Sequence, residues 1–296
     1  MLTVYKGDYT VFGDTSPPKD NTNLNFTNRI NKKLIKSLKG VPITPRNDRS
    51  DRWKGIQHGE LVESLWEVMD DLYNYKPVNP VFAVAPNGAA LIGGFELSKL
   101  EKGKLKPLLV KGIPQKTTYA FGMLHSNDSR KAAKFCIGGR VALCMNGLVS
   151  ASEIWKRKHT KGLFLKDWLR EKFSLFMDKR ELAGAQTAAL VEQSVTRKSW
   201  DNLVLRLCRE SVLPWRLAGQ LDKSWSLARD NEIVSWVPGD QGAEKWDFNA
   251  NLWDAYNAIT HTSKDVPPAK QLDTLEKSFR ICLDLVPSRK LSFSVN

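Results

Sequence analysis

The sequence has few of the residues that build metal centres or disulfide frameworks. Only four cysteines occur in 296 residues; they are widely spaced and form no CxxC pair. Zinc sites usually draw their ligands from closely spaced pairs, and disulfide scaffolds are short and rich in cysteine. We therefore expect reduced, buried thiols in a reducing compartment at Cys136, Cys144, Cys208 and Cys282.

Histidine is equally scarce, with four residues at positions 58, 125, 159 and 261 and no HxxxH pair. His125 and Cys136 flank a predicted turn, so a hairpin could bring them together. A hydrogen-bonded histidine and a buried thiol are the favoured interpretation of that pair. We expect no metal and no cofactor.

Long hydrophobic runs are absent too. The apolar segments are short and interrupted by charges or glycine, and the start, MLTVYKGDYTVFGD, has neither a basic nor an apolar leader segment. Such a pattern predicts no membrane span and no signal peptide. The expected location is the cytoplasm of a host cell.

Catalytic motifs are missing from the sequence. There is no GxSxG elbow and no glycine-rich phosphate loop, and the Gly138-Gly139 pair is typical of a bulge in a strand. The acidic residues Glu60, Glu63, Glu67 and Asp70-Asp71 fit a solvated helix face, and a two-metal nuclease would need more carboxylates near the strands. We predict that the protein is not an enzyme.

Positive charge is what the sequence has in excess. The formal net charge is +13, and 13 Lys/Arg against four Asp/Glu between Arg130 and Arg180 give that stretch a net charge of +9. A concentrated positive field favours an anionic partner such as nucleic acid, and the alternative is a solvated surface that only aids solubility.

Hydrophobic periodicity places strands in the middle of the chain and helices on either side. Alternating segments from 81 to 148, with turns at Pro86-Asn87-Gly88 and at His125–Ser129, predict antiparallel hairpins. Apolar residues at helical spacing predict helices over 24–39, 58–75, 163–195, 249–261 and 272–286. The Trp-rich segment from Trp215 to Trp246 is expected to be a loop, and residues 1–23 a loose arm or short hairpin.

The predicted fold class is therefore α+β, an antiparallel sheet of hairpins packed by flanking helices, with a helical C-terminal extension. The predicted parts are an N-terminal arm and short helix (1–45), an α+β core (46–200) and a mostly helical region (201–296).

Aromatic rings interleave the basic stretch, and single strands are gripped by stacking bases on such rings. Trp155 lies in the polar segment SEIWKRKHTK and is expected to be exposed, whereas Phe164 and Trp168 fit the apolar stripe of a helix and are expected in the core. The predicted nucleic-acid-binding residues are Arg130, Lys131, Lys134, Arg140, Trp155, Lys156, Arg157, Lys158 and Lys161.

Four segments carry a family resemblance: DRWKGIQHGELVESLWEVMDDL, FGMLHSNDSRKAAKFCIGGRVALCMNGLVSA, KRKHT and NLWDAYNAITH. Together they cover about residues 46 to 265, and they resemble the phage- and plasmid-encoded family called domain of unknown function 932. The most specific match is Cys144-Met145-Asn146-Gly147-Leu148. In the turn at His125–Ser129 the His and Ser are transposed relative to the family pattern, and Arg130 and Lys131 replace the usual residues that follow.

The resemblance implies a phage or mobile-element origin and no established activity. The order of elements is also similar to that of single-strand annealing proteins, which form rings and lay single-stranded DNA in a basic groove. Asn146-Gly147 is expected to be a turn that ends a strand, and His125–Ser129 a hairpin turn whose Ser and Asp side chains bond the backbone. Contact with phosphate or DNA is the alternative for both turns.

The leading hypothesis is a non-catalytic protein that binds single-stranded DNA in recombination or replication, as a ring-shaped homo-oligomer if the analogy holds. The alternative is a mobile-element protein that binds and inhibits a host defence protein through Trp215, Trp225, Trp236 and Trp246, since tryptophan is enriched at binding hot spots. A third hypothesis, a metal-dependent nuclease, requires three or more carboxylates or histidines clustered at the strands.

Overall fold

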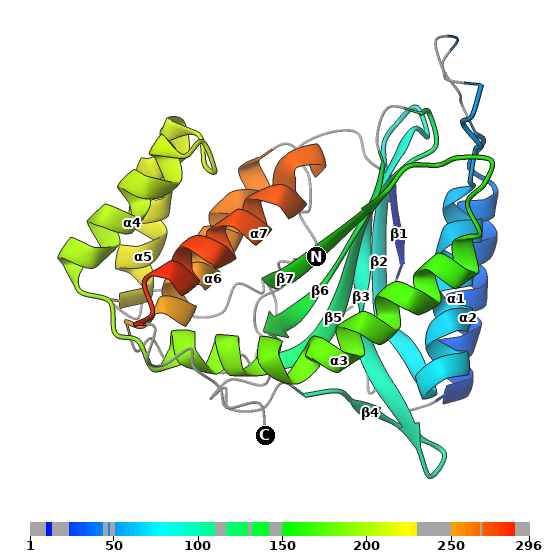
Figure 1. Ribbon diagram of the computed structural model, residues 1–296, viewed down its shortest axis with the longest axis horizontal. Helices are drawn as coiled ribbons and strands as arrows, with labels where there is room; N and C mark the ends of the chain where they lie inside the picture. Colours follow the sequence, from blue (N-terminus) through cyan, green and yellow to red (C-terminus); the bar gives the residue numbers. More distant parts are fainter. Residues whose placement is uncertain are drawn as a thin grey trace.

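The structure, a computed structural model, describes residues 10–13, 24–43, 47, 51–109, 117–129, 132–141, 150–229, 250–266 and 268–287 (Figure 1). Helices, then strands, then helices follow one another along the chain, which confirms the predicted α+β class. The strands are β1 (Thr10–Gly13), β2 (Tyr75–Val84), β3 (Ala90–Glu101), β4 (Lys104–Pro107), β5 (Thr117–Ser126), β6 (Ala133–Val141) and β7 (Ser150–Arg157). The helices are α1 (Leu24–Lys39), α2 (His58–Tyr73), α3 (Leu165–Val191), α4 (Arg197–Arg209), α5 (Ala218–Arg229), α6 (Leu252–Thr262) and α7 (Pro268–Asp284), with the 3-10 turns η1 (Trp215–Leu217) and η2 (Ser263–Asp265).

The strands form one open antiparallel sheet in the order β1-β2-β3-β5-β6-β7, and β4 pairs with the C-terminal half of β3. The predicted hairpin at Pro86-Asn87-Gly88 joins β2 to β3, and Gly88 has the positive φ of 69° that such a turn requires. Gly94 on β3 lies where two backbones approach closely, because a Cβ there would be 2.2 Å from the carbonyl oxygen of Phe121 on β5.

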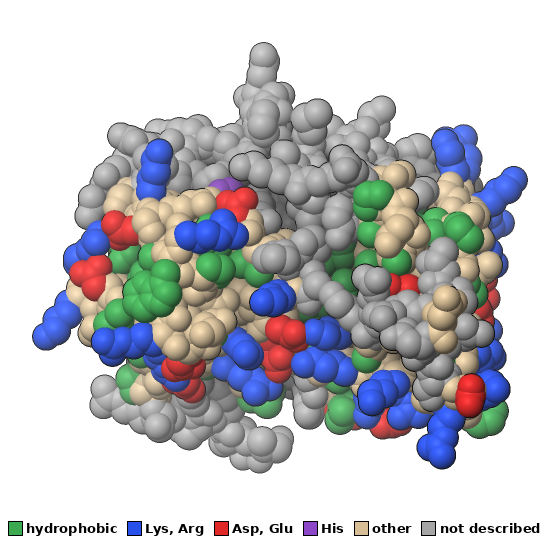
Figure 2. All heavy atoms as spheres, turned by 90° about the horizontal axis from the view of Figure 1, so that it is seen from above, with side chains coloured by type: hydrophobic (Ala, Val, Ile, Leu, Met, Phe, Trp, Pro, Cys, Tyr) green, Lys and Arg blue, Asp and Glu red, His purple; other side chains and the backbone are tan. Residues whose placement is uncertain are grey.

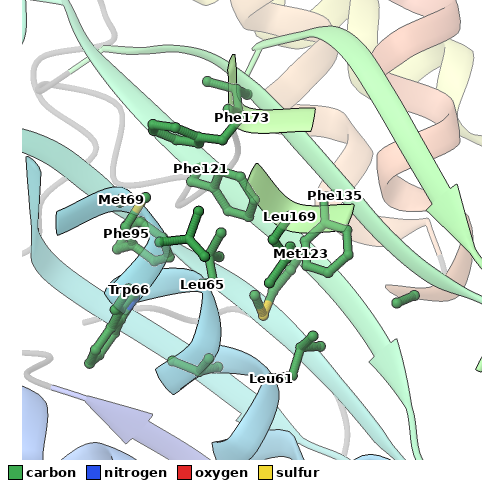
Figure 3. Close-up of a cluster of buried hydrophobic side chains, with 14 of the residues drawn as sticks. Leu61, Leu65, Trp66, Met69, Phe95, Phe121, Met123, Phe135, Leu169 and Phe173 are labelled. Carbon is green, nitrogen blue, oxygen red and sulfur yellow. The ribbon is translucent and has the colours of Figure 1, made fainter. Parts of the chain in front are cut away.

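One face of the sheet packs against α1, α2 and α3 and forms the larger core (Figures 1 and 3). Leu65 and Met69 of α2 point toward the strands, and Phe95 and Phe121 face them from β3 and β5 (Figure 3). The two phenylalanine rings stack with centroids 5.3 Å apart, and Phe173 of α3 completes the cluster from the other side.

The opposite face carries smaller side chains, so a helix can approach it closely. Ala120 and Cys136 on this face meet Leu272 and Leu275 of α7, which lies against β7. The C-terminal helices then form a second core around Trp200, Trp253, Tyr256 and Phe279, where the rings of Trp200 and Trp225 stack 4.3 Å apart.

Three details differ from the sequence prediction. β2 starts at Tyr75, inside the predicted helix end, and tolerates Pro77 because the residues of β2 that pair with the described part of β1 are only Val81–Val84. Residues 150–157 form strand β7 rather than the start of a helical region. Residues 215–229 are helical (η1 and α5) rather than a loop.

Within the described ranges, no helix is long and apolar enough to cross a membrane.

Candidate functional site

The upper end of the sheet in Figure 1 gathers segments that are far apart in the sequence. The segment after β7 pairs with the segment before α2 through a bridge between Trp53 and Thr160, and the Lys54 amide donates to the His159 carbonyl at 3.3 Å. The side-chain amide of Asn127, which follows β5, donates to the Pro42 carbonyl at 3.0 Å. These contacts place His58, His125 and His159 at one end of the sheet.

The three histidines form a buried cluster. Their relative exposures are 0% for His58, 0% for His125 and 4% for His159. The Nδ1 atoms of His58 and His125 lie 2.6 Å apart, and the rings of His125 and His159 lie 4.7 Å apart at a tilt of 33°.

The hydrogen bonds of His58 fix its tautomer and that of His125. His58 Nε2 lies 2.9 Å from the Gly88 carbonyl, which only accepts, so this nitrogen carries the proton. Neutral His58 then accepts at Nδ1, and His125 donates from its own Nδ1. His125 Nε2 is left with a lone pair, and it is buried without a hydrogen-bond partner among the described residues, as are both ring nitrogens of His159.

Burial keeps the cluster neutral. It lowers the pKa of His159 to about 4, helped by the nearby His58. Burial also lowers the pKa of His125 well below its ordinary value, and repulsion from His58 and His159 adds to that shift. Burial also lowers the pKa of His58, although the hydrogen bond to the Gly88 carbonyl raises it in part.

The cluster is not a metal centre in this structure. The Nδ1 atoms of His58 and His125 face each other, while the ring of His159 lies tilted beside that of His125 and makes no hydrogen bond to either histidine. Over the described part of the chain, no group of three or more His, Cys, Asp or Glu side chains could hold a metal ion. Short-range spacing could not reveal the cluster, because these histidines are 67 and 34 positions apart.

The buried thiols agree with the sequence prediction where they are described. Cys136, Cys208 and Cys282 are free and buried, and burial raises the pKa of Cys136 and of Cys282 to about 12. Thiols of this kind are poor nucleophiles at neutral pH.

The predicted basic stretch divides into paired and unpaired cations. Lys134 and Lys156 stand on neighbouring strands, and both reach Asp273 of α7, at 2.5 and 3.3 Å. Burial alone would raise the pKa of Asp273, but its hydrogen bonds to these lysines and their charges outweigh that effect and lower it. Lys134 is therefore a link between sheet and helix, with only 15% of its side chain exposed.

Helix α2 neutralises other cations. Glu67 binds Lys166 at 2.6 Å and Glu63 binds Lys39 at 2.6 Å, while Asp71 lies 3.5 Å from Arg170. The acidic face predicted to be merely solvated thus holds ion pairs with α1 and α3.

Arg157, Lys158 and Lys161, at and after the end of β7, are exposed and make no ion pair with any described residue, and the same is true of Lys54 beside them. Backbone bonds hold the two segments together, since the Lys161 amide donates to the Arg52 carbonyl at 2.8 Å. We call Lys54, Arg157, Lys158 and Lys161 the basic end.

Helix α1 adds positive charge without any acidic residue. Its Lys32, Lys33 and Lys36 are exposed. In Figure 2, which looks down on the upper end of the molecule, Lys and Arg side chains line the right margin, where α1 and α2 lie in Figure 1.

Two of the three predictions for aromatic side chains are wrong. Trp155 is 8% exposed and packs against Phe176 of α3, because its position on β7 faces the larger core. Phe164, expected in the core, is 76% exposed and directly follows the basic end as the residue before α3. Trp168 is buried, as predicted.

Some predicted residues cannot be placed. Arg130, Lys131 and the segment Cys144–Leu148 lie outside the described residues, and for Arg140 the structure describes only the backbone, on β6.

The turn after β5 is described through Ser129. In this turn Ser126 Oγ donates to the Asp128 carboxylate. Its side-chain bonds thus run within the turn and to the remote Pro42 rather than only to the local backbone.

The Trp-rich segment is also divided. Trp225 is buried against Trp200, whereas Trp215 is 60% exposed. Trp236 and Trp246 lie outside the described residues.

Comparison with known proteins finds no matching family model, no matching curated protein and no matching solved structure.

Proposed function

We propose that the protein binds single-stranded nucleic acid at the basic end, with Phe164 as a stacking ring. The observation that carries this proposal is the position of a 76% exposed phenylalanine three residues after Lys161, beside cations without ion-pair partners in the described structure.

A large exposed apolar ring is costly to leave in water, and a nucleobase offers it a flat partner. The cations of the basic end supply the complementary contact to phosphate. Those at Lys134 and Lys156 are less available for this purpose, because Asp273 already binds them. The proposal therefore moves the interface from the strand surface to the end of the sheet, and keeps Arg157, Lys158 and Lys161 from the sequence prediction.

The test is fluorescence anisotropy of a labelled single-stranded oligonucleotide as a function of salt, with a duplex of the same sequence alongside. We expect tight binding of the single strand with a steep negative salt slope. Each phosphate contact contributes about 0.7 to that slope for single strands, so Lys158→Ala with Lys161→Ala should flatten it by about 1.4.

The matched control changes two exposed lysines at the opposite end of the sheet, Lys102 and Lys104. Their replacement by Ala alters the net charge equally, so it should leave the slope near the wild-type value. Phe164→Ala should cost about 1–3 kcal/mol of binding free energy, and Phe164→Tyr should retain most of it. The proposal would be refuted if the double lysine variant and Phe164→Ala both bound the single strand as the wild type does.

A role in strand annealing, a ring-shaped assembly and a phage or plasmid origin belong to the same proposal. The first two are supported by the analogy in the order of elements, and the third by the sequence resemblance. The role in strand annealing is tested by mixing the wild-type protein with complementary oligonucleotides in the absence of ATP and measuring duplex formation.

A further inference from the structure

A recess lies between the turn after α4 and the N-terminal half of α7. It encloses about 620 Å³. Trp215 stands in its wall with 60% of the residue exposed, although the other tryptophans of the C-terminal helices, Trp200, Trp225 and Trp253, are buried in the second core.

The charged residues of this groove are mostly positive. Arg216, Lys270 and Lys277 line it against one carboxylate, Asp273. That carboxylate is already bound by Lys134 and Lys156, so it presents little uncompensated negative charge to a ligand. Lys270 and Lys277 are exposed and form no ion pair with any residue that the structure describes.

Arg216 is held toward η2 by a hydrogen bond. Its guanidinium donates to the Asp265 carbonyl at 3.2 Å, and Gln220 holds the Asp265 carboxylate at 2.7 Å. The turn that carries Trp215 is anchored by the Leu217 amide, which donates to the Pro214 carbonyl at 2.9 Å. Because the backbone of this turn is anchored, it loses little conformational entropy when a ligand binds beside Trp215.

We propose that this groove binds a nucleotide, with the base stacked on Trp215 and the phosphate at Lys270 and Lys277. An aromatic ring and two lysines without ion-pair partners among the described residues match the two chemical features that a nucleotide combines, a π face and a phosphate. A peptide or protein partner has no general need for both features at one place. The groove is a proposal separate from the basic end, because Trp215, Lys270 and Lys277 are not residues of the basic end.

The groove and the basic end are joined through β7. Lys156, which binds Asp273 of the groove, directly precedes Arg157 of the basic end. The nucleotide can therefore be free in solution or be part of a strand that also reaches the basic end, and the two sources share the same contacts in the groove.

The experiment measures binding of two probes, adenosine 5′-monophosphate by calorimetry and a 12-nucleotide single-stranded oligothymidylate by anisotropy. Binding of both probes assigns the groove to free nucleotides as well as strands, and binding of the oligonucleotide alone assigns it to strands. We expect Trp215→Ala to weaken binding by roughly 5- to 150-fold, the range of one lost stacking contact, and Trp215→Phe to restore most of it.

Lys270→Ala with Lys277→Ala should flatten the salt slope of oligonucleotide binding by about 1.4. The control is Arg280→Ala, which removes one cation of α7 that is paired with Glu276 at 2.6 Å and does not line the groove. It should bind like the wild type. Because Trp215 and both lysines are exposed, these changes leave the two cores intact.

The experiment distinguishes a failure of the groove proposal from a failure of the proposal that the basic end binds single strands. Loss of binding in the Phe164 variant with wild-type binding in the Trp215 variant overturns the groove and leaves the basic end standing. The reverse result supports the groove alone. A wild-type protein that binds neither probe overturns both.

Discussion

Acid should destabilise this protein through its buried histidines, and His159 gives the magnitude. An unfolded histidine has a pKa of about 6.5, whereas burial lowers the pKa of His159 to about 4. Between these values the unfolded chain binds the additional proton, so the free energy of unfolding falls as the pH falls. At pH 4.5 the loss from His159 alone is about 2.5 kcal/mol relative to pH 8, since one pKa unit corresponds to about 1.4 kcal/mol. His58 and His125 shift in the same direction and add to the loss.

The assay is urea denaturation at pH 8, 6.5, 5.5 and 4.5, with the free energy of unfolding extrapolated to water at each pH. His159→Phe keeps a flat ring against His125 and removes two buried nitrogens that have no partner among the described residues. We expect this variant to be as stable as the wild type at pH 8 and to lose about 2.5 kcal/mol less by pH 4.5. His261→Gln changes the histidine outside the cluster and serves as the control. Equal acid losses in the wild type and His159→Phe would show that His159 is not held neutral, and the reasoning would fail.

Three further changes test other parts of the structure. Gly94→Ala places a Cβ 2.2 Å from the Phe121 carbonyl and should lower the free energy of unfolding by about 3 kcal/mol or more in urea denaturation. Trp155→Phe removes a buried Nε1 without a described partner, so it should cost less than about 1.5 kcal/mol and leave oligonucleotide affinity unchanged. Asp273→Asn leaves Lys134 half-buried without its counter-charge and should cost about 1–3 kcal/mol, read from the shift in urea midpoint at pH 7.

The fold class followed from the sequence because local patterns decide it. Helix α1 has the predicted bounds, and the Pro86-Asn87-Gly88 turn forms its hairpin, since both depend on residues that are near one another in the chain. β7 was missed because residues 150–157 mix charged and apolar residues, and only pairing with β6 makes them a strand. The same strand pairing buries Trp155, which its polar neighbours in the sequence had concealed.

The candidate site was predictable in part. Charge density pointed to the segment that contains Arg157, Lys158 and Lys161, but it could not separate these cations from Lys134 and Lys156. That separation depends on Asp273, which is 139 positions from Lys134 in the sequence and reaches it only because α7 packs on the sheet. Phe164 has an apolar neighbourhood at helical spacing, yet it precedes the first turn of α3 and so escapes the core.

The buried histidines and the exposed cations lie at the same end of the sheet, and the neutral state of the histidines suits the positive charge of that surface. His159 lies between Lys158 and Lys161 in the sequence, and its carbonyl accepts from the Lys54 amide. A charged imidazole would therefore add repulsion where four cations already stand without ion-pair partners among the described residues. Keeping His159 neutral avoids that repulsion at neutral pH, and the bond to Gly88 with the chain of Nδ1 contacts gives His58 and His125 a neutral arrangement to match. The backbone bonds between segments 52–54 and 159–161 then hold the cations of the basic end on neighbouring segments. Among the described residues, this surface concentrates positive charge where backbone pairing and neutral rings hold the segments together, and the ion pair of Lys166 with Glu67 uses no cation of the basic end.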